Sequence, residues 1–391
     1  MPELPVSGRY LPELDGVRAI AIGMVLLVHC VVVPQQGLIA WALRQTLVNG
    51  GYGVDLFFVL SGYLITSILL RAKARPHYFR NFYARRFLRI FPLYYAIVLV
   101  LAACSRWLPF GPMDPVWPYF LYVSNLFMVF TLRDWAPLGH TWSLAIEEQF
   151  YLVFPILVLW VGKVRLRFVL WSVILVTPLI RVITSAALFP AASAFATFCR
   201  LDVLAMGALI ALEFDGRTEI SDRAARRLRL TFAVFAAAST ILWLTKQLDF
   251  RKLLFKAAGL TVVDLTAALF VCVVLAAPGK SLTWVLRRPA AVAMGRISYG
   301  LYLIHYPILR IVQAQTSKRL ADTWTRTAVV ASVTLAATMV LAIMSWYLFE
   351  RPILRLKKRF YERGEEAAHV EAAMIETPVA LSLESESSLP K

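Results

Sequence analysis

Charged residues are scarce in this chain. Lys, Arg, Asp and Glu make up 17% of its 391 residues, whereas hydrophobic residues make up 59%. This composition, with a mean hydropathy of +0.66, excludes a soluble globular domain of this size. The apolar runs reach about 20 residues, which is the length that a helix needs to cross a bilayer. The sequence therefore predicts an all-α fold, a polytopic transmembrane helical bundle.

Clustered metal ligands are also missing from the sequence. The four cysteines stand singly without CxxC spacing, and the five histidines form no HxxxH or HxxE pair. We therefore expect no metal site. The N-terminus has no basic segment followed by a small-residue cleavage site, so we expect the first apolar segment to be retained.

Basic residues outnumber acidic ones, which gives a net charge of +17. On a soluble protein this excess suggests nucleic-acid binding, but here no folded basic domain stands outside the apolar segments. With the N-terminus inside, the predicted inner loops hold 25 Lys and Arg and the outer loops hold 10. This asymmetry predicts a multi-pass protein of the inner (plasma) membrane with both termini in the cytoplasm.

Ten apolar segments are predicted to be spans. They cover residues 17–34, 52–70, 91–108, 142–161, 168–186, 195–213, 230–245, 257–277, 297–314 and 327–349. The segment 116–130 is also apolar, but it is short and aromatic, so we expect an outer interfacial or re-entrant element there. We divide the chain into a cytoplasmic tail at 1–13, a transmembrane domain at 14–361 and a disordered, acidic cytoplasmic tail at 362–391.

Three ionisable residues lie inside predicted spans, at similar depth in the outer half of the membrane. They are His29, Asp55 and Glu147. Because such groups are costly inside a membrane, each one is a candidate functional residue. The first two spans form a hairpin, which favours a contact between His29 and Asp55. A carboxylate there would orient the imidazole as a general base, whereas the alternative is a structural histidine that joins two helices.

A second group of candidates lies at the inner ends of the spans. Arg86 and Arg89 share a helix face because of their i, i+3 spacing, and Arg18 begins the first span at the same level. Arg18 and His29 also fall on nearly one face of the first span, about 16 Å apart along its axis. Three arginines at one mouth suit bidentate binding of phosphates. Lipid-headgroup anchoring is the alternative.

Further polar residues fall inside later spans. Tyr302 and His305 share a helix face, and they either line a polar cavity or join two helices by hydrogen bonds. Arg200 and Asp202 are expected to be buried, with a partner that compensates their charge. Two more arginines in predicted spans have no partner that the sequence can name: Arg181 and Arg310.

Seven segments, taken together and in order, carry a family resemblance. They are "LDGVRAIAIGMVLLVH", "GVDLFFVLSGYLIT", "RRFLRIFPLYY", "TWSLAIEEQFYLVFP", "RLDVLAMGAL", "ISYGLYLIHYP" and "FERP", and they extend from residue 14 to about residue 352. The series resembles acyltransferase family 3, whose members are integral-membrane O-acyltransferases, many of which acetylate surface glycans. Some members carry a C-terminal extracytoplasmic SGNH domain, but here we expect the transmembrane module alone.

The resemblance implies a role for individual residues. The family's arginine–histidine pair, with ten residues between its members, falls on Arg18 and His29. The aspartate of its GVDxFF motif is Asp55, and its R-x-x-R pair is Arg86 and Arg89. We therefore expect His29 to be the general base and Asp55 to orient it. The arginines are expected to bind the phosphates of cytoplasmic acyl-CoA, acetyl-CoA being the common donor in the family.

The family's W-S-L-x-x-E motif falls on Trp142, Ser143 and Glu147. We expect Glu147 to act in catalysis, and the hydroxyl acceptor, a glycan or glycolipid, to be bound by Trp142, Ser143, Tyr302 and His305. The predicted function is transfer of an acyl group from acyl-CoA to a hydroxyl of a surface glycan. The alternative is a proton-coupled transporter or flippase that uses the three ionisable residues above, although no inverted repeat is evident. The acceptor, the acyl group and the oligomeric state cannot be read from the sequence.

Overall fold

Helices make up nearly all of the regular structure in the computed structural model. It describes residues 10–34, 36–111, 113–131, 137–188, 192–215, 220–245, 247–248, 252–276, 281–321 and 323–360, and no strand occurs among them. The predicted tail at 362–391 and most of the tail at 1–13 lie outside these residues. The predicted fold class, an all-α helical bundle, is confirmed.

A helix occupies the position of each predicted span. These helices are α1 (Pro12–Cys30), α3 (Gly53–Ala72), α4 (Tyr78–Cys104), α7 (Trp142–Trp160), α8 (Lys163–Ala187), α10 (Leu201–Phe214), α11 (Asp222–Leu244), α12 (Leu260–Ala276), α15 (Ser298–Ser317) and α16 (Trp324–Ser345). Within the described ranges, seven stretches are long and apolar enough to cross a membrane, and α1, α10 and α15 are not among them. These three helices bury many of their residues, so other helices rather than lipid surround much of their surface.

Short helices connect or extend these long ones. They are α2 (Leu38–Leu47), η2 (Val48–Tyr52), η3 (Ser105–Trp107), α5 (Trp117–Phe120), α6 (Ser124–Thr131), η4 (Gly139–Thr141), α9 (Ala192–Phe195), η5 (Thr197–Cys199), η6 (Phe255–Gly259), α13 (Ser281–Leu286), α14 (Pro289–Arg296), η7 (Trp346–Glu350), α17 (Arg351–Arg355) and η8 (Leu356–Phe360). The segment 116–130 contains α5 and most of α6. With 4 and 8 residues, neither helix is long enough to cross a bilayer.

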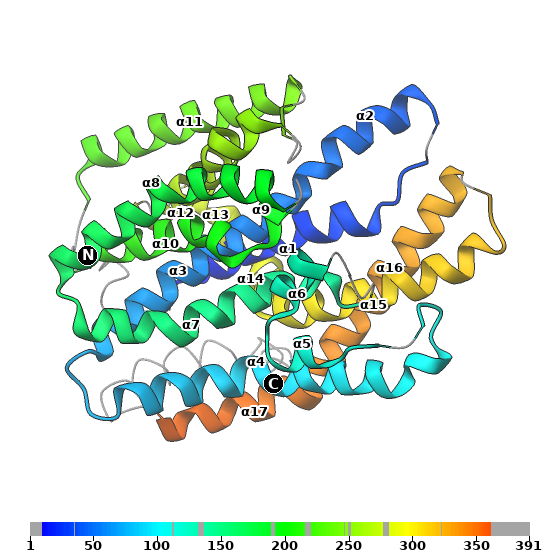
Figure 1. Ribbon diagram of the computed structural model, residues 1–391, viewed down its shortest axis with the longest axis horizontal. Coiled ribbons are helices and arrows are strands. Elements are labelled where there is room, and N and C mark those ends of the chain that lie inside the picture. The colour runs from blue at the N-terminus through cyan, green and yellow to red at the C-terminus, as the bar shows by residue number, and fades with distance from the viewer. Residues whose placement is uncertain are drawn as a thin grey trace, which may run out of the picture.

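α3 lies at the centre of the bundle (Figure 1). It packs against α1, α7, α10 and α12, and buried residues occur on all sides of it. A helix that is apolar all round is suited to such a position. α4 runs along one side of the bundle with α17 and η8 against it, and α11 covers the opposite side by packing on α12.

Basic side chains gather where several helices end, and we call this part of the bundle the basic end. Lys73, just after α3, donates to two carbonyl oxygens at the end of α7, at 2.7 and 3.0 Å. Lys163, at the start of α8, pairs with Asp215 just after α10. At the opposite end, the far end, Thr327 at the start of α16 donates to the carbonyl oxygen of Val32 just after α1, at 2.6 Å.

The backbones of α3 and α10 touch where these two helices cross. A Cβ atom added at Gly62 would meet the carbonyl oxygen of Leu204, and one added at Gly207 would meet that of Val59. Glycine at both positions permits this approach, as in other closely packed membrane helices. The crossing holds the central helix of the bundle in register with α10.

Replacing either glycine of this crossing by alanine should destabilise the protein. The added methyl group has to push two helix backbones apart, and overpacking of this kind costs about 1–3 kcal/mol. We expect Gly62→Ala and Gly207→Ala each to lower the melting temperature in detergent. Gly23→Ala in α1 is the matched control, because a Cβ there meets only the terminal methyl group of Met294, at 3.9 Å. Equal melting temperatures for the three variants would contradict the close crossing.

Candidate functional site

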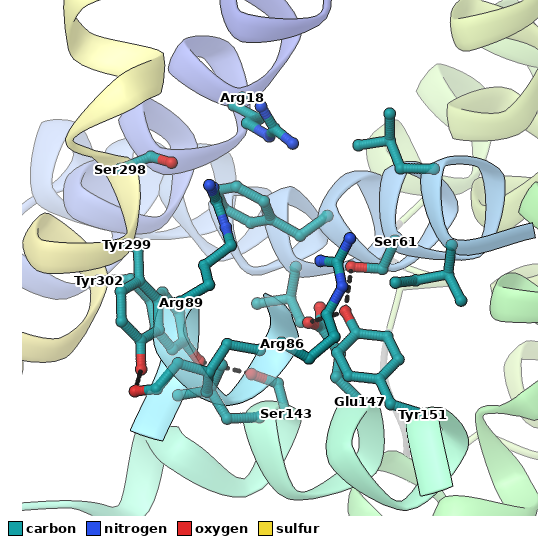
Figure 2. A pocket seen from close by; sticks show the side chains of 16 residues that line it. Arg18, Ser61, Arg86, Arg89, Ser143, Glu147, Tyr151, Ser298, Tyr299 and Tyr302 are labelled. Atoms are coloured by element: carbon teal, nitrogen blue, oxygen red, sulfur yellow. Dashed lines mark hydrogen bonds between the residues drawn. The ribbon is translucent and has the colours of Figure 1, made fainter. Parts of the chain in front are cut away.

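A cavity lies among α1, α3, α4, α7 and α15 (Figure 2). Arg18 reaches it from α1, Arg86 and Arg89 reach it from α4, and Tyr302 reaches it from α15. α4 presents both of its arginines because residues at i and i+3 share a helical face. The cavity encloses about 100 Å³, several times the volume that one water molecule needs. The three arginines singled out from the sequence thus meet at one site.

Among the described residues, ion pairs compensate the charge of only one of the three arginines of this cavity. Nη1 of Arg18 lies 2.5 Å from Oδ1 of Asp15. The guanidinium of Arg86 faces the ring of Tyr151, with 5.8 Å between its carbon and the ring centroid. Neither Arg86 nor Arg89 has an ion-pair partner within the described part of the chain. Such an excess of positive charge in a cavity attracts an anion.

A fourth basic residue, Lys357 of η8, lies close to these arginines. Burial, together with the nearby Arg89 and Arg86, lowers the pKa of its amine well below the usual value. A bound anion would favour the protonated amine, because it would supply the missing negative charge. The sequence did not reveal Lys357, since it is one of many basic residues that follow the last span.

Glu147 lies in the wall of this cavity. The hydroxyl of Tyr151 is 2.8 Å from Oε2 of Glu147 and 3.0 Å from Oγ of Ser61. A hydroxyl has one hydrogen, so Tyr151 donates it to the carboxylate and accepts from Ser61. The prediction that Glu147 and His29 have similar depth was wrong. His140 is level with His29, because both rings pack against Tyr306. Glu147 follows His140 by seven residues along η4 and α7, which places it about 10 Å closer to the basic end.

Ser143 and Tyr302 form the side of the cavity away from Arg18 (Figure 2). The hydroxyl of Tyr302 donates to the backbone oxygen of His140 at 2.5 Å, and it lies 2.7 Å from Oγ of Ser143. Because the tyrosine hydrogen is committed to the carbonyl group, Ser143 is the donor in the second bond. We call this pair the Ser143–Tyr302 wall.

Behind this wall, His29 of α1 and His305 of α15 form a hydrogen-bonded pair. Nδ1 of His29 lies 3.0 Å from Nε2 of His305, and Nδ1 of His305 lies 2.7 Å from the carbonyl oxygen of Tyr302. A carbonyl oxygen only accepts, so Nδ1 of neutral His305 carries the hydrogen and its Nε2 is an acceptor. His29 therefore donates through Nδ1, and its Nε2 keeps a lone pair. This is the tautomer that a general base needs.

The predicted contact between His29 and Asp55 is not formed. Asp55, in the first turn of α3, pairs with Arg200 instead. The cause is the register of α1 against α3. Gly53 packs against Ala21, which is eight residues and about 12 Å from His29 along α1. The ring of His29 is oriented by a second histidine and not by a carboxylate, and the three ionisable residues of the predicted proton relay have separate partners.

Asp55 belongs to a network of five charged side chains, all of them buried. Arg181 of α8 lies 2.8 Å from Asp202 of α10 and 3.6 Å from Asp264 of α12. Arg200, at the start of α10, contacts Asp55 and lies 3.8 Å from Asp264. The network supplies the partners that the sequence could not name for Arg181, and it joins α3 to three helices that pack around it, α8, α10 and α12. Two guanidinium groups here face three carboxyl groups.

His140 is a site residue that sequence patterns did not single out. It precedes α7 in η4, and its ring centroid lies 5.0 Å from those of His305 and Tyr306. Its place directly before the T-W-S-L segment was the only available signal. With His29, three histidines from distant parts of the chain gather here. Among the described residues, however, no group of three or more His, Cys, Asp and Glu is arranged to hold a metal ion.

Two residues singled out from the sequence lie outside the site. Trp142, predicted to bind the acceptor, packs its ring against two phenylalanine rings and is not among the residues that line the cavity. Arg310 lies in α15, and no hydrogen bond or ion pair assigns it a partner in the ranges that the structure describes.

Known proteins resemble this chain over most of its length. A family model described as an acyltransferase domain, that of acyltransferase family 3, matches residues 11–344. The chain belongs to acyltransferase family 3. The match extends from the start of α1 almost to the end of α16, so the basic cavity, the histidine pair and the buried charge network all lie inside the acyltransferase domain.

Two relatives in acyltransferase family 3 carry informative names. The peptidoglycan O-acetyltransferase OatA of Listeria monocytogenes is 28% identical over 372 residues, which cover 89% of this chain and 56% of the relative. The O-acetyltransferase OatA of Staphylococcus aureus is 30% identical over 333 residues, which cover 79% and 52%. The chain thus spans about half the length of the curated relatives it matches. No solved structure matches it.

Proposed function

We propose that this protein is a membrane-bound O-acyltransferase that moves an acyl group from acyl-CoA to a hydroxyl of a cell-envelope glycan. Acetyl is the proposed acyl group. The observation that carries the proposal is a cavity lined by arginines, with the His29–His305 pair on the other side of the Ser143–Tyr302 wall. Membership of acyltransferase family 3 supports the reaction class. The names of the two relatives support acetyl as the acyl group and peptidoglycan as the first acceptor to test.

The basic cavity suits the nucleotide end of acyl-CoA. The 3′-phosphate and the diphosphate carry several negative charges, and arginine binds phosphate oxygens in bidentate fashion. Arg86 and Arg89 have no competing ion pair among the described residues, and Arg18 borders the same space. The pantetheine arm is long and thin, and the distance of about 16 Å from Arg18 to His29 is comparable to its reach. The thioester would then arrive at the wall in front of His29.

His29 acts on the acceptor in this scheme. Its Nε2 lone pair removes the proton of the acceptor hydroxyl while that oxygen attacks the carbonyl carbon of the thioester. The tetrahedral intermediate collapses when the C–S bond breaks, and CoA leaves as the thiol after taking the proton back from Nε2. His305 holds the ring throughout, because its Nε2 accepts from Nδ1 of His29. The same bond stabilises the imidazolium that exists between the two steps.

The remaining candidates act as positioning residues. Glu147 is fixed by the Tyr151 hydroxyl within the cavity wall, in the same cavity as Arg86. Asp55 acts at a distance from the reacting atoms, since it fixes Arg200 and with it the start of α10. Both residues support the site, and neither one is proposed to move a proton.

The basic end of the bundle is proposed to face the cytoplasm. The excess of Lys and Arg in the loops at that end favours this orientation. Acyl-CoA is a cytoplasmic metabolite, so the cavity would open toward the compartment that supplies the donor. The glycan hydroxyl would approach the histidines from the far end, and both substrates would meet inside the membrane.

Loss of the two α4 arginines should weaken donor binding. A hydrogen bond to a charged group contributes about 1.5–3 kcal/mol. The double variant Arg86→Gln, Arg89→Gln loses at least one such bond from each arginine, so we expect the KM for acetyl-CoA to rise by about 100-fold or more. CoA release by purified protein in nanodiscs, with peptidoglycan fragments as acceptor, measures this. Arg80→Gln is the matched control, because Arg80 lies on the same helix over the ring of Phe360 and outside the cavity.

Two outcomes of that experiment would count against the proposal. If the wild-type protein releases no CoA from acetyl-CoA with any hydroxyl acceptor, the O-acyltransferase function itself fails. If the wild-type protein is active but the double variant keeps a normal KM, the reaction class stands, and the arginines only anchor lipid headgroups.

A further inference from the structure

His140 is a buried polar side chain whose ring nitrogens have no hydrogen-bond partner. The residue is 5% exposed, and neither Nδ1 nor Nε2 is paired with a group that the structure describes. The backbone carbonyl groups of Tyr302 and Leu303 lie near the ring, but neither meets the criteria for a hydrogen bond to Nδ1 or Nε2. A neutral imidazole always has one N–H donor, and leaving it unpaired in the interior costs free energy. A buried N–H without a partner is expected where a bound ligand supplies the missing hydrogen-bond acceptor.

The ring of His140 contacts both the Ser143–Tyr302 wall and the histidine pair. Its centroid is 5.2 Å from that of Tyr302 and 5.0 Å from that of His305. Tyr306 packs against both His29 and His140, with centroid distances of 5.2 and 5.0 Å. His140 thus lies next to the histidine pair, where the proposed function brings the thioester and the acceptor hydroxyl together.

The hydrogen atoms of four neighbouring polar side chains are already assigned. His29 donates to His305, and His305 donates to the carbonyl oxygen of Tyr302. Tyr302 donates to the backbone oxygen of His140, and Ser143 donates to Tyr302. Of these five residues, His140 alone keeps an uncommitted side-chain hydrogen. His29 is the proposed base of the site. The reaction also needs a hydrogen-bond donor that stabilises the negative charge forming on the carbonyl oxygen.

We propose that His140 donates an N–H hydrogen bond to the carbonyl oxygen of the acyl thioester and to the oxyanion that it becomes. This inference rests on the proposed function. As the acceptor oxygen bonds to the carbonyl carbon, the C=O π electrons move onto oxygen, and His140 stabilises them without giving up its proton. When the C–S bond breaks, the carbonyl group reforms and the hydrogen bond weakens. His140 is then a catalytic residue that no motif of the sequence marked.

Variants at position 140 test this role. Removal of one oxyanion donor typically lowers kcat by about 10²–10³-fold, so we expect His140→Ala to do so while the KM for acetyl-CoA changes less than about threefold. His140→Gln keeps a side-chain N–H donor and should recover at least about tenfold of the lost kcat. His140→Leu removes the donor at similar volume and should stay as slow as His140→Ala.

A spectroscopic measurement separates hydrogen bonding from packing. Acetyl-CoA labelled with ¹³C at the carbonyl should show a lower carbonyl stretching frequency when it is bound to the wild-type protein and to His140→Gln. The shift should be absent in His140→Leu. If the leucine variant folds and keeps kcat within threefold of the wild type, or if the leucine and glutamine variants are equally slow with the same carbonyl frequency, the inference is wrong. An inactive wild-type protein would instead refute the proposed function.

Discussion

His29→Ala should lower the turnover of acyl transfer by about 10²–10⁴-fold, which is the usual contribution of a general base. Nε2 of His29 is the proposed proton acceptor, and alanine leaves the acceptor hydroxyl protonated when the thioester arrives. The KM for acetyl-CoA should stay nearly constant, because the arginines of the cavity are unchanged. CoA release at saturating donor concentration, measured for the purified wild-type and variant proteins, checks both expectations.

Two further variants make the His29 experiment specific. Cys30→Ala changes the neighbouring buried side chain in the same helical turn, and it should keep the wild-type turnover. His305→Gln keeps a polar group next to His29 but loses the imidazole that selects its tautomer, so its turnover should lie between the other two. A folded His29→Ala protein with at least a tenth of the wild-type turnover would eliminate this residue as the base.

Arg181→Met should be the most destabilising of the substitutions considered for the buried charge network. It leaves three carboxyl groups around the single guanidinium of Arg200. Breaking a buried ion pair by removal of one partner typically lowers the free energy of unfolding by about 3–5 kcal/mol. Thermal unfolding of the purified protein in detergent measures the loss, and the yield of monodisperse protein should fall with it.

Asp264→Asn is the matched change on the acidic side of the network. It keeps the size of the side chain and leaves two carboxyl groups facing two guanidinium groups, so formal charges balance. We expect it to cost less than about half of what Arg181→Met costs. An asparagine variant that is as unstable as the methionine variant would show that the surplus carboxyl group is needed for stability.

The parts of the structure that follow from one helix at a time could be predicted from the sequence. The long helices were evident because a bilayer imposes a minimum length on each apolar run. The shared face of Arg86 and Arg89 was evident because i, i+3 spacing is a property of the helix alone. Arg18 joined them since it lies in the second turn of α1, at the same end of the bundle.

Contacts between helices could not be predicted in the same way. The depth of His29 and Asp55 was counted from the span ends, but the close packing of Gly53 on Ala21 sets the actual register. The partners of Arg181 come from helices that no local pattern links to α8. His140 lies in a three-residue turn, where no periodicity exists to distinguish a buried residue from an exposed one.

The Ser143–Tyr302 wall has a consequence for the size of the group that is transferred. The tyrosine hydroxyl is held by a serine on one side and by a backbone carbonyl on the other, so the ring resists turning aside. A two-carbon unit needs little room beyond that ring, whereas a fatty chain would have to displace it. By fixing Tyr302, these hydrogen bonds would therefore limit the length of the acyl chain that can reach the histidines.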